Sequence, residues 1–99
     1  MLLQMANLER INASQNKLDS IPAEIKNLAN LQVLDLNYNE LECLPDELGE
    51  LQNLRFLYLA SNHLSTLPQA LRSLKSLAYL NITHNGMNSL QEWIGGWDN

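Results

Sequence analysis

The sequence predicts an α/β solenoid of about four repeats, with short parallel strands on one side and short helical turns on the other. The first observation is a recurrence every 23 residues of the segment LQVLDLNYNELECLP, which runs from Leu31 to Pro45. The second is the spacing within that segment, where leucines and one asparagine fall at steps of 3, 2, 3, 2 and 3. These steps fit neither a helix nor a long strand, and they are typical of a short strand that turns into a loop.

The strand of each repeat is predicted from the pattern around Leu34. In Val33-Leu34-Asp35-Leu36 the two leucines alternate with other residues, so an extended chain places both on one face. Because the units repeat, each strand is expected to pair in parallel with the equivalent strand of the next unit. The four strands should therefore form one continuous sheet.

The return path of each repeat is predicted to be a short helical turn. Pro22, Pro45 and Pro68 fit the first position of such a turn, where the missing N–H group does no harm. The apolar residues that follow each proline step by three, which suits an α or 3₁₀ segment on the outer side. They are Ile25, Leu28 and Leu31, then Leu48, Leu51 and Leu54, then Leu71, Leu74 and Leu77. No unit can bury these residues alone, so stability requires stacked neighbours.

The pattern resembles the leucine-rich repeat, L-x-x-L-x-L-x-x-N-x-L, and its trailing L-P-x-x-I/L resembles the 23-residue class typical of intracellular scaffolds. The resemblance covers about residues 2–97, so we expect a single domain over 1–99. Its units would span about 5–27, 28–50, 51–73 and 74–97. The resemblance implies a right-handed solenoid with a concave parallel sheet and short helical or 3₁₀ turns on the convex side.

The resemblance also implies a structural ladder of asparagines. Its members are Asn16, Asn39, Asn62 and Asn85. In the family these amides turn inward and bond to loop backbone groups of adjacent units. The physical reason is general, because a tight buried turn leaves peptide groups without partners and an amide offers both a donor and an acceptor.

Partner contacts are expected on the concave sheet, where the family carries them on strand positions that are not leucine. Carried onto this chain, the expected partner-binding residues are Arg10, Val33, Asp35, Tyr38, Phe56, Tyr58, Tyr79 and Asn81. Exposed aromatic side chains on a rigid sheet make good interface anchors. The alternative is that these aromatics only pack on one another across the strands. Arg10 and Asp35 are either partner contacts or solvated charges.

Other polar residues give weaker signals. Glu40, Glu42, Asp46, Glu47 and Glu50 either dock a basic partner or form a solvated face. His63, His84 and Cys43 fall in different columns and make no zinc spacing, and Cys43 is interpreted as a partly buried structural residue. Two N-x-S/T patterns, at Asn12 and at Asn81, are interpreted as chance matches. No catalytic constellation is visible, so we expect no enzyme activity, cofactor or metal.

The composition excludes two classes of partner and indicates the cellular compartment. The net charge of −5 argues against nucleic acid and anionic membranes, which need a basic patch. No stretch approaches the roughly 20 apolar residues of a membrane span. A single cysteine cannot form an internal disulfide, and the start of the chain does not resemble a signal peptide. We therefore expect a cytoplasmic protein.

These observations predict a non-catalytic module that binds a protein partner on the concave sheet. One alternative is a structural fragment that self-associates through uncapped ends, because residues 1–7 are expected to cap the first layer poorly. Ala13 also thins the first strand at the position of Leu36 and Leu59. Another is the targeting domain of a larger enzyme, such as a ligase or a kinase.

Overall fold

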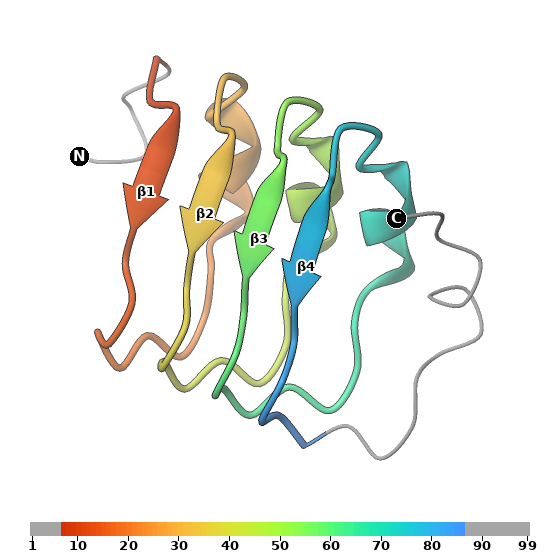
Figure 1. Cartoon of the computed structure of the whole chain (residues 1–99). Helices are drawn as coiled ribbons and strands as arrows, with labels where there is room; N and C mark the ends of the chain where they lie inside the picture. The colour runs from red at the N-terminus through yellow and green to blue at the C-terminus, as the bar shows by residue number, and fades with distance from the viewer. Residues whose placement is uncertain (1–6, 87–99) are drawn as a thin grey trace.

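The structure, a computed structural model, describes residues 7–86. Strands and 3₁₀ helices (η) alternate along the chain (Figure 1). They are β1 (Arg10–Asn12), η2 (Ala23–Asn27), β2 (Val33–Asp35), η3 (Asp46–Glu50), β3 (Phe56–Tyr58), η4 (Gln69–Ser73) and β4 (Tyr79–Asn81). The start of the first predicted unit and the end of the last lie outside the described residues.

The four strands form one parallel sheet in the order β1-β2-β3-β4. The register pairs Arg10 with Val33, Val33 with Phe56, and Phe56 with Tyr79. Figure 1 shows the strands side by side, with the 3₁₀ turns stacked in a second row behind them. The predicted fold class, a solenoid with one parallel sheet and short helical turns, is confirmed.

The position of the prolines differs from the prediction by one residue. Pro22, Pro45 and Pro68 are not the first residue of each turn but the N-cap before it, with φ between −74° and −68° and ψ between 141° and 156°. The locked φ of proline suits both positions, whereas the extended ψ belongs to the cap. From there the Pro22 carbonyl accepts a hydrogen bond from the Ile25 N–H at 3.1 Å.

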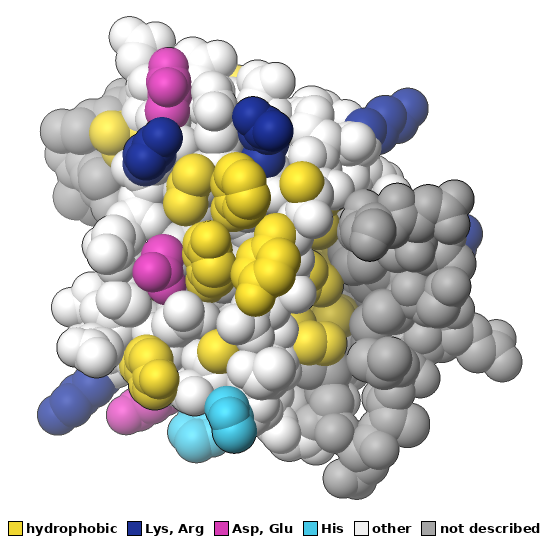
Figure 2. Space-filling view, in the orientation of Figure 1, with side chains coloured by type: hydrophobic (Ala, Val, Ile, Leu, Met, Phe, Trp, Pro, Cys, Tyr) yellow, Lys and Arg dark blue, Asp and Glu magenta, His cyan; other side chains and the backbone are white. Residues whose placement is uncertain are grey.

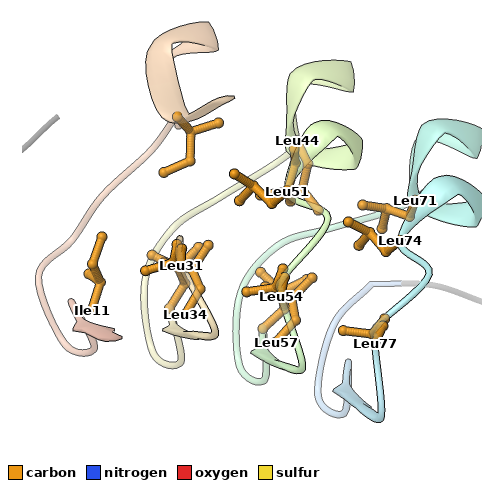
Figure 3. Close-up of a cluster of buried hydrophobic side chains, with 14 of the residues drawn as sticks. Ile11, Leu31, Leu34, Leu44, Leu51, Leu54, Leu57, Leu71, Leu74 and Leu77 are labelled. Carbon is orange, nitrogen blue, oxygen red and sulfur yellow. The ribbon is translucent and has the colours of Figure 1, made fainter. Parts of the chain in front are cut away.

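The core lies between the sheet and the row of turns. Figure 3 shows the leucines that precede and form the strands, such as Leu31 with Leu34 and Leu54 with Leu57, pointing into this layer from successive units. Leucines from the turns, including Leu51 and Leu71, meet them from the other side. Each unit thus contributes apolar side chains to a core that continues through the whole stack.

The first unit contains an apolar cavity that is partly open to solvent. An apolar cavity of about 170 Å³ lies against Ile11, Ala13, Leu18 and Ile21. Ala13 supplies one methyl group at the position where Leu36 and Leu59 fill the core. The short side chain of Ala13 leaves room for this cavity.

None of the helices among residues 7–86 combines the length and the hydropathy that a bilayer crossing requires.

Candidate functional site

The exposed face of the sheet carries seven of the eight predicted partner-binding residues. In β1, β2 and β3 the central residue is buried and the two flanking residues point out, as the period of a strand requires. In β4 the central Leu80 is half-buried and packs against the core. One outward row consists of Arg10, Val33, Phe56 and Tyr79, and the other of Asn12, Asp35, Tyr58 and Asn81. The structure therefore brings these predicted residues together on one surface.

Four side chains on this face form an aromatic patch, defined here as Val33, Phe56, Tyr58 and Tyr79. The Tyr58 and Tyr79 rings lie 5.5 Å apart between centroids and are tilted by 50°, a favourable aromatic geometry. Tyr79 nevertheless keeps 45% of its surface exposed. Figure 2 shows hydrophobic side chains gathered over the strands in the middle of this face. The rings thus contact one another and still present apolar surface to solvent.

Arg55 borders the aromatic patch and was not among the residues predicted from the sequence. Its guanidinium carbon lies 5.7 Å from the centroid of the Phe56 ring, which is cation–π geometry. Arg55 directly precedes β3, and its backbone bonds place it between Gln32 and Ala78 of the neighbouring units. The available signal was the dipeptide Arg55-Phe56, a basic residue immediately before an aromatic strand position.

In the second outward row, three of the four side chains accept hydrogen bonds from backbone N–H groups two residues further along the chain. The Asp35 Oδ1 accepts a hydrogen bond from the Asn37 N–H at 3.1 Å. The Asn81 Oδ1 accepts bonds from both the N–H and the Oγ1 hydroxyl of Thr83, and Asn12 makes the same pair with Ser14. These Asx turns give the two N-x-S/T patterns a structural role at the ends of the strands.

Tyr58 interrupts this row, because tyrosine cannot make an Asx turn. Here the Ala60 N–H instead donates to the Oδ1 of Asn37, one unit earlier, at 2.7 Å. Ala60 is buried, so its N–H needs a protein partner. Asn37 thus compensates for the tyrosine that the aromatic patch requires at position 58.

We predict that Asn37→Ala lowers the free energy of unfolding by about 1.5 kcal/mol, because the buried Ala60 N–H loses its acceptor. In a Tyr58→Asn background the same change should cost less than about 0.5 kcal/mol, because residue 58 can then form its own Asx turn. Urea titrations of the two single variants, the double variant and the wild type measure this coupling. Equal costs in both backgrounds would contradict the compensation.

Tyr38, the eighth predicted residue, lies in the loop that follows β2 and is 59% exposed. Its φ is 59°, and Gln15, Ser61 and His84 adopt nearly the same angle at the equivalent positions. This left-handed conformation turns the chain sharply before each ladder asparagine, and it is uncommon for a bulky residue. Tyr38 therefore belongs to the turn at the edge of the face.

The ladder asparagines at the centre of the stack bond to backbone groups of adjacent units. The Asn39 Oδ1 accepts bonds from the N–H groups of Asn16 and Leu18, and its Nδ2 donates to the Ala13 carbonyl. Asn39 and Asn62 are buried and Asn85 is half-buried. Asn16 differs from the expected inward position because it is exposed, since residues 7–86 provide no earlier unit to cover it.

The remaining polar candidates form no metal site among the described residues. Cys43 is exposed rather than partly buried, and so are Ser20 and Thr66 at the equivalent positions. Within residues 7–86 no group of three or more histidine, cysteine or acidic side chains is placed to hold a metal ion. Of the acidic residues, Asp46 and Glu47 lie in the first turn of η3, where a negative charge is favourable.

The comparisons with known proteins agree with this architecture. The family model for the leucine-rich repeat region matches residues 2–95. A leucine-rich repeat protein of Leptospira interrogans is similar in structure, with a TM-score of 0.86 and 38% identity over 88% of this chain and 22% of that chain. An internalin of Listeria monocytogenes has a TM-score of 0.82 and 26% identity over 96% of this chain and 27% of its own.

The chain thus spans about a quarter of the length of these two proteins. Among curated proteins, none matches the sequence significantly. The family model covers nearly the whole chain, and the two solved structures share its fold over most of its length. The chain belongs to the leucine-rich repeat family.

Proposed function

We propose that the chain is a recognition module that binds a protein partner on the exposed face of its sheet. Membership of the leucine-rich repeat family supports an interaction module in general terms. The observation that carries the proposal is the aromatic patch, in which Tyr79 stays 45% exposed beside Tyr58. Clustered tyrosines are typical anchors of protein interfaces, because they bury large apolar area at a small cost in conformational entropy.

The strands that carry the aromatic patch support the same proposal. The inner strands β2 and β3 are paired in parallel on both sides, and their central residues are anchored in the core. β4, which carries Tyr79, is paired with β3. The outward side chains are therefore presented by a rigid backbone, which lowers the entropic cost of binding.

Affinity capture from a native lysate tests the proposal. The wild-type chain is compared with Tyr58→Ala/Tyr79→Ala and with a matched control, Glu24→Ala/Arg72→Ala, whose residues are exposed on the turns η2 and η4. We expect a protein that the wild type and the control retain and the tyrosine variant loses, while circular dichroism shows all three folded. If the wild type, the control and the tyrosine variant all retain the same proteins, binding on this face is contradicted.

A second candidate, self-association, is favoured by the partly open apolar cavity of the first unit. The cavity of about 170 Å³ beside Ala13 lies next to the half-buried Leu18 and Ile21. If this surface pairs with a second copy, a tagged wild-type chain will retain an untagged copy of the same chain. The tyrosine variant will retain that copy equally well, which distinguishes this candidate from partner binding on the sheet.

A further inference from the structure

We infer that the partner segment carries an acidic side chain next to an apolar one, and that Arg55 binds the acid while the aromatic patch binds the apolar side chain. This inference rests on the proposed function and specifies the chemistry of the partner. It starts from Arg55, which is exposed at the border of the patch.

The geometry of Arg55 suits a carboxylate. Among residues 7–86 the structure gives its guanidinium one partner, the Phe56 ring at 5.7 Å. A guanidinium that lies over a ring uses its face for that contact and keeps the N–H groups around its edge for other partners. Those groups match a carboxylate in a bidentate arrangement, which is stronger than a neutral hydrogen bond.

No acidic side chain at the equivalent position of the two neighbouring units compensates the positive charge of Arg55. The neighbouring units carry Gln32 and Ala78 at this position, and both are uncharged. Glu9 holds the equivalent position in the first unit, and Gln32 separates it from Arg55. Arg10 adds a second positive charge at the start of β1 on the same face. Figure 2 shows Lys and Arg side chains along one border of the hydrophobic group.

The negative charge of the rest of the molecule restricts the place where an acidic segment can bind. The chain has a net charge of −5, and the turn η3 places Asp46 and Glu47 away from the exposed face of the sheet. An acidic segment is therefore repelled by the molecule as a whole and attracted at the border of the patch. Such complementarity contributes more to specificity and orientation than to affinity.

The negative charge of Asp35, on the same face, would instead favour a basic residue in the partner. Its Oδ1 already accepts the Asn37 N–H, so the Asx turn uses part of its capacity. Asp35 is also half-buried, whereas Arg55 is exposed. The geometry therefore favours Arg55 as the charged contact, and a basic partner segment becomes an outcome of the test.

A phage-displayed library of random peptides, selected on the immobilised wild-type chain, tests the inference. We expect the enriched peptides to carry aspartate or glutamate beside an aromatic or aliphatic residue. For a synthetic peptide of the enriched sequence, Arg55→Glu should weaken binding about tenfold or more, as loss of a charge-assisted contact implies. Replacing the acid of that peptide with lysine should restore binding to Arg55→Glu.

The matched control is Arg72→Glu, which makes the same charge change at an exposed position on η4 and should bind the peptide as the wild type does. Peptides that require Tyr58 and Tyr79 but show no acidic preference, or bind Arg55→Glu normally, would overturn the inference and leave the proposed function standing. Peptides with a basic residue that depend on Asp35 would overturn it as well. If no sequence is enriched on the wild type relative to Tyr58→Ala/Tyr79→Ala, both proposals fail.

Discussion

Replacing Asn62 with leucine should lower the free energy of unfolding by about 3 kcal/mol, because several buried backbone groups lose their partners at once. The Asn62 Oδ1 accepts the Leu41 N–H at 3.1 Å, and its Nδ2 donates to the carbonyls of Leu36 and Leu59 at 3.0 and 3.1 Å. Asn62 is only 4% exposed, so water cannot replace these bonds. Leucine has a similar size, so the loss would come from the polar groups rather than from a cavity.

Urea unfolding followed by circular dichroism measures the effect, with Asn16→Leu as the matched control. Asn16 belongs to the same ladder but is exposed. Its replacement should cost less than about 1 kcal/mol, as is usual for surface positions. Similar midpoints for Asn62→Leu and the wild type would contradict a stabilising ladder, and equal losses in both variants would show that burial does not set the cost.

The strands and the buried rows could be predicted from the sequence because burial repeats at the same place in every unit. Leu34 and Leu57 face the core at equivalent positions, and the outward residues follow by alternation. The same regularity brought Phe56 and Tyr79 onto one face. The pattern therefore predicted the backbone and the surface together, since in a parallel stack the register fixes both.

The details that were missed depend on features that vary from unit to unit. The position of Arg55 holds Gln32 and Ala78 in the neighbouring units, so no repeated signal marked it. The bond from the Ala60 N–H to Asn37 depends on the side-chain conformation of Asn37 and on the local loss of an Asx turn at Tyr58. The sequence pattern carries neither kind of information.

The ambiguity of the prolines has a different origin. The φ of proline is nearly the same before a helical turn and in its first position, so the residue type alone cannot distinguish the two. The ψ of Pro45 is 149°, and its carbonyl accepts the Leu48 N–H at 3.2 Å. Only the structure shows that the turn begins one residue later.

We expect Gly49→Ala to lower the free energy of unfolding by about 2–3 kcal/mol, because the added methyl group has no room. A Cβ at Gly49 would clash with the carbonyl oxygen of Ala70 and lie 2.8 Å from its carbonyl carbon. These are backbone atoms of η4, so no side-chain rotation can relieve the clash. The equivalent residues Lys26 and Arg72 are exposed, so the close approach is specific to the pair of turns η3 and η4.

The two turns are also tied together by Gln52, whose Nε2 donates to the Gly49 carbonyl at 3.3 Å and to the Ser73 carbonyl at 3.1 Å. To admit a methyl group, η3 and η4 must move apart and weaken this bridge. Thermal and urea unfolding of Gly49→Ala would measure the cost of that separation.

Gly86→Ala is the matched control, because the nearest atom to its added Cβ is the Leu64 carbonyl oxygen at 3.6 Å, an ordinary contact. Both substitutions restrict the unfolded chain in the same way, which on its own stabilises a protein by about 0.4–1 kcal/mol. The difference between the two variants therefore isolates the contact between η3 and η4. If both variants unfold at the same urea concentration, the outer turns can separate freely, and the packing of the stack must depend on the sheet and the leucine core alone.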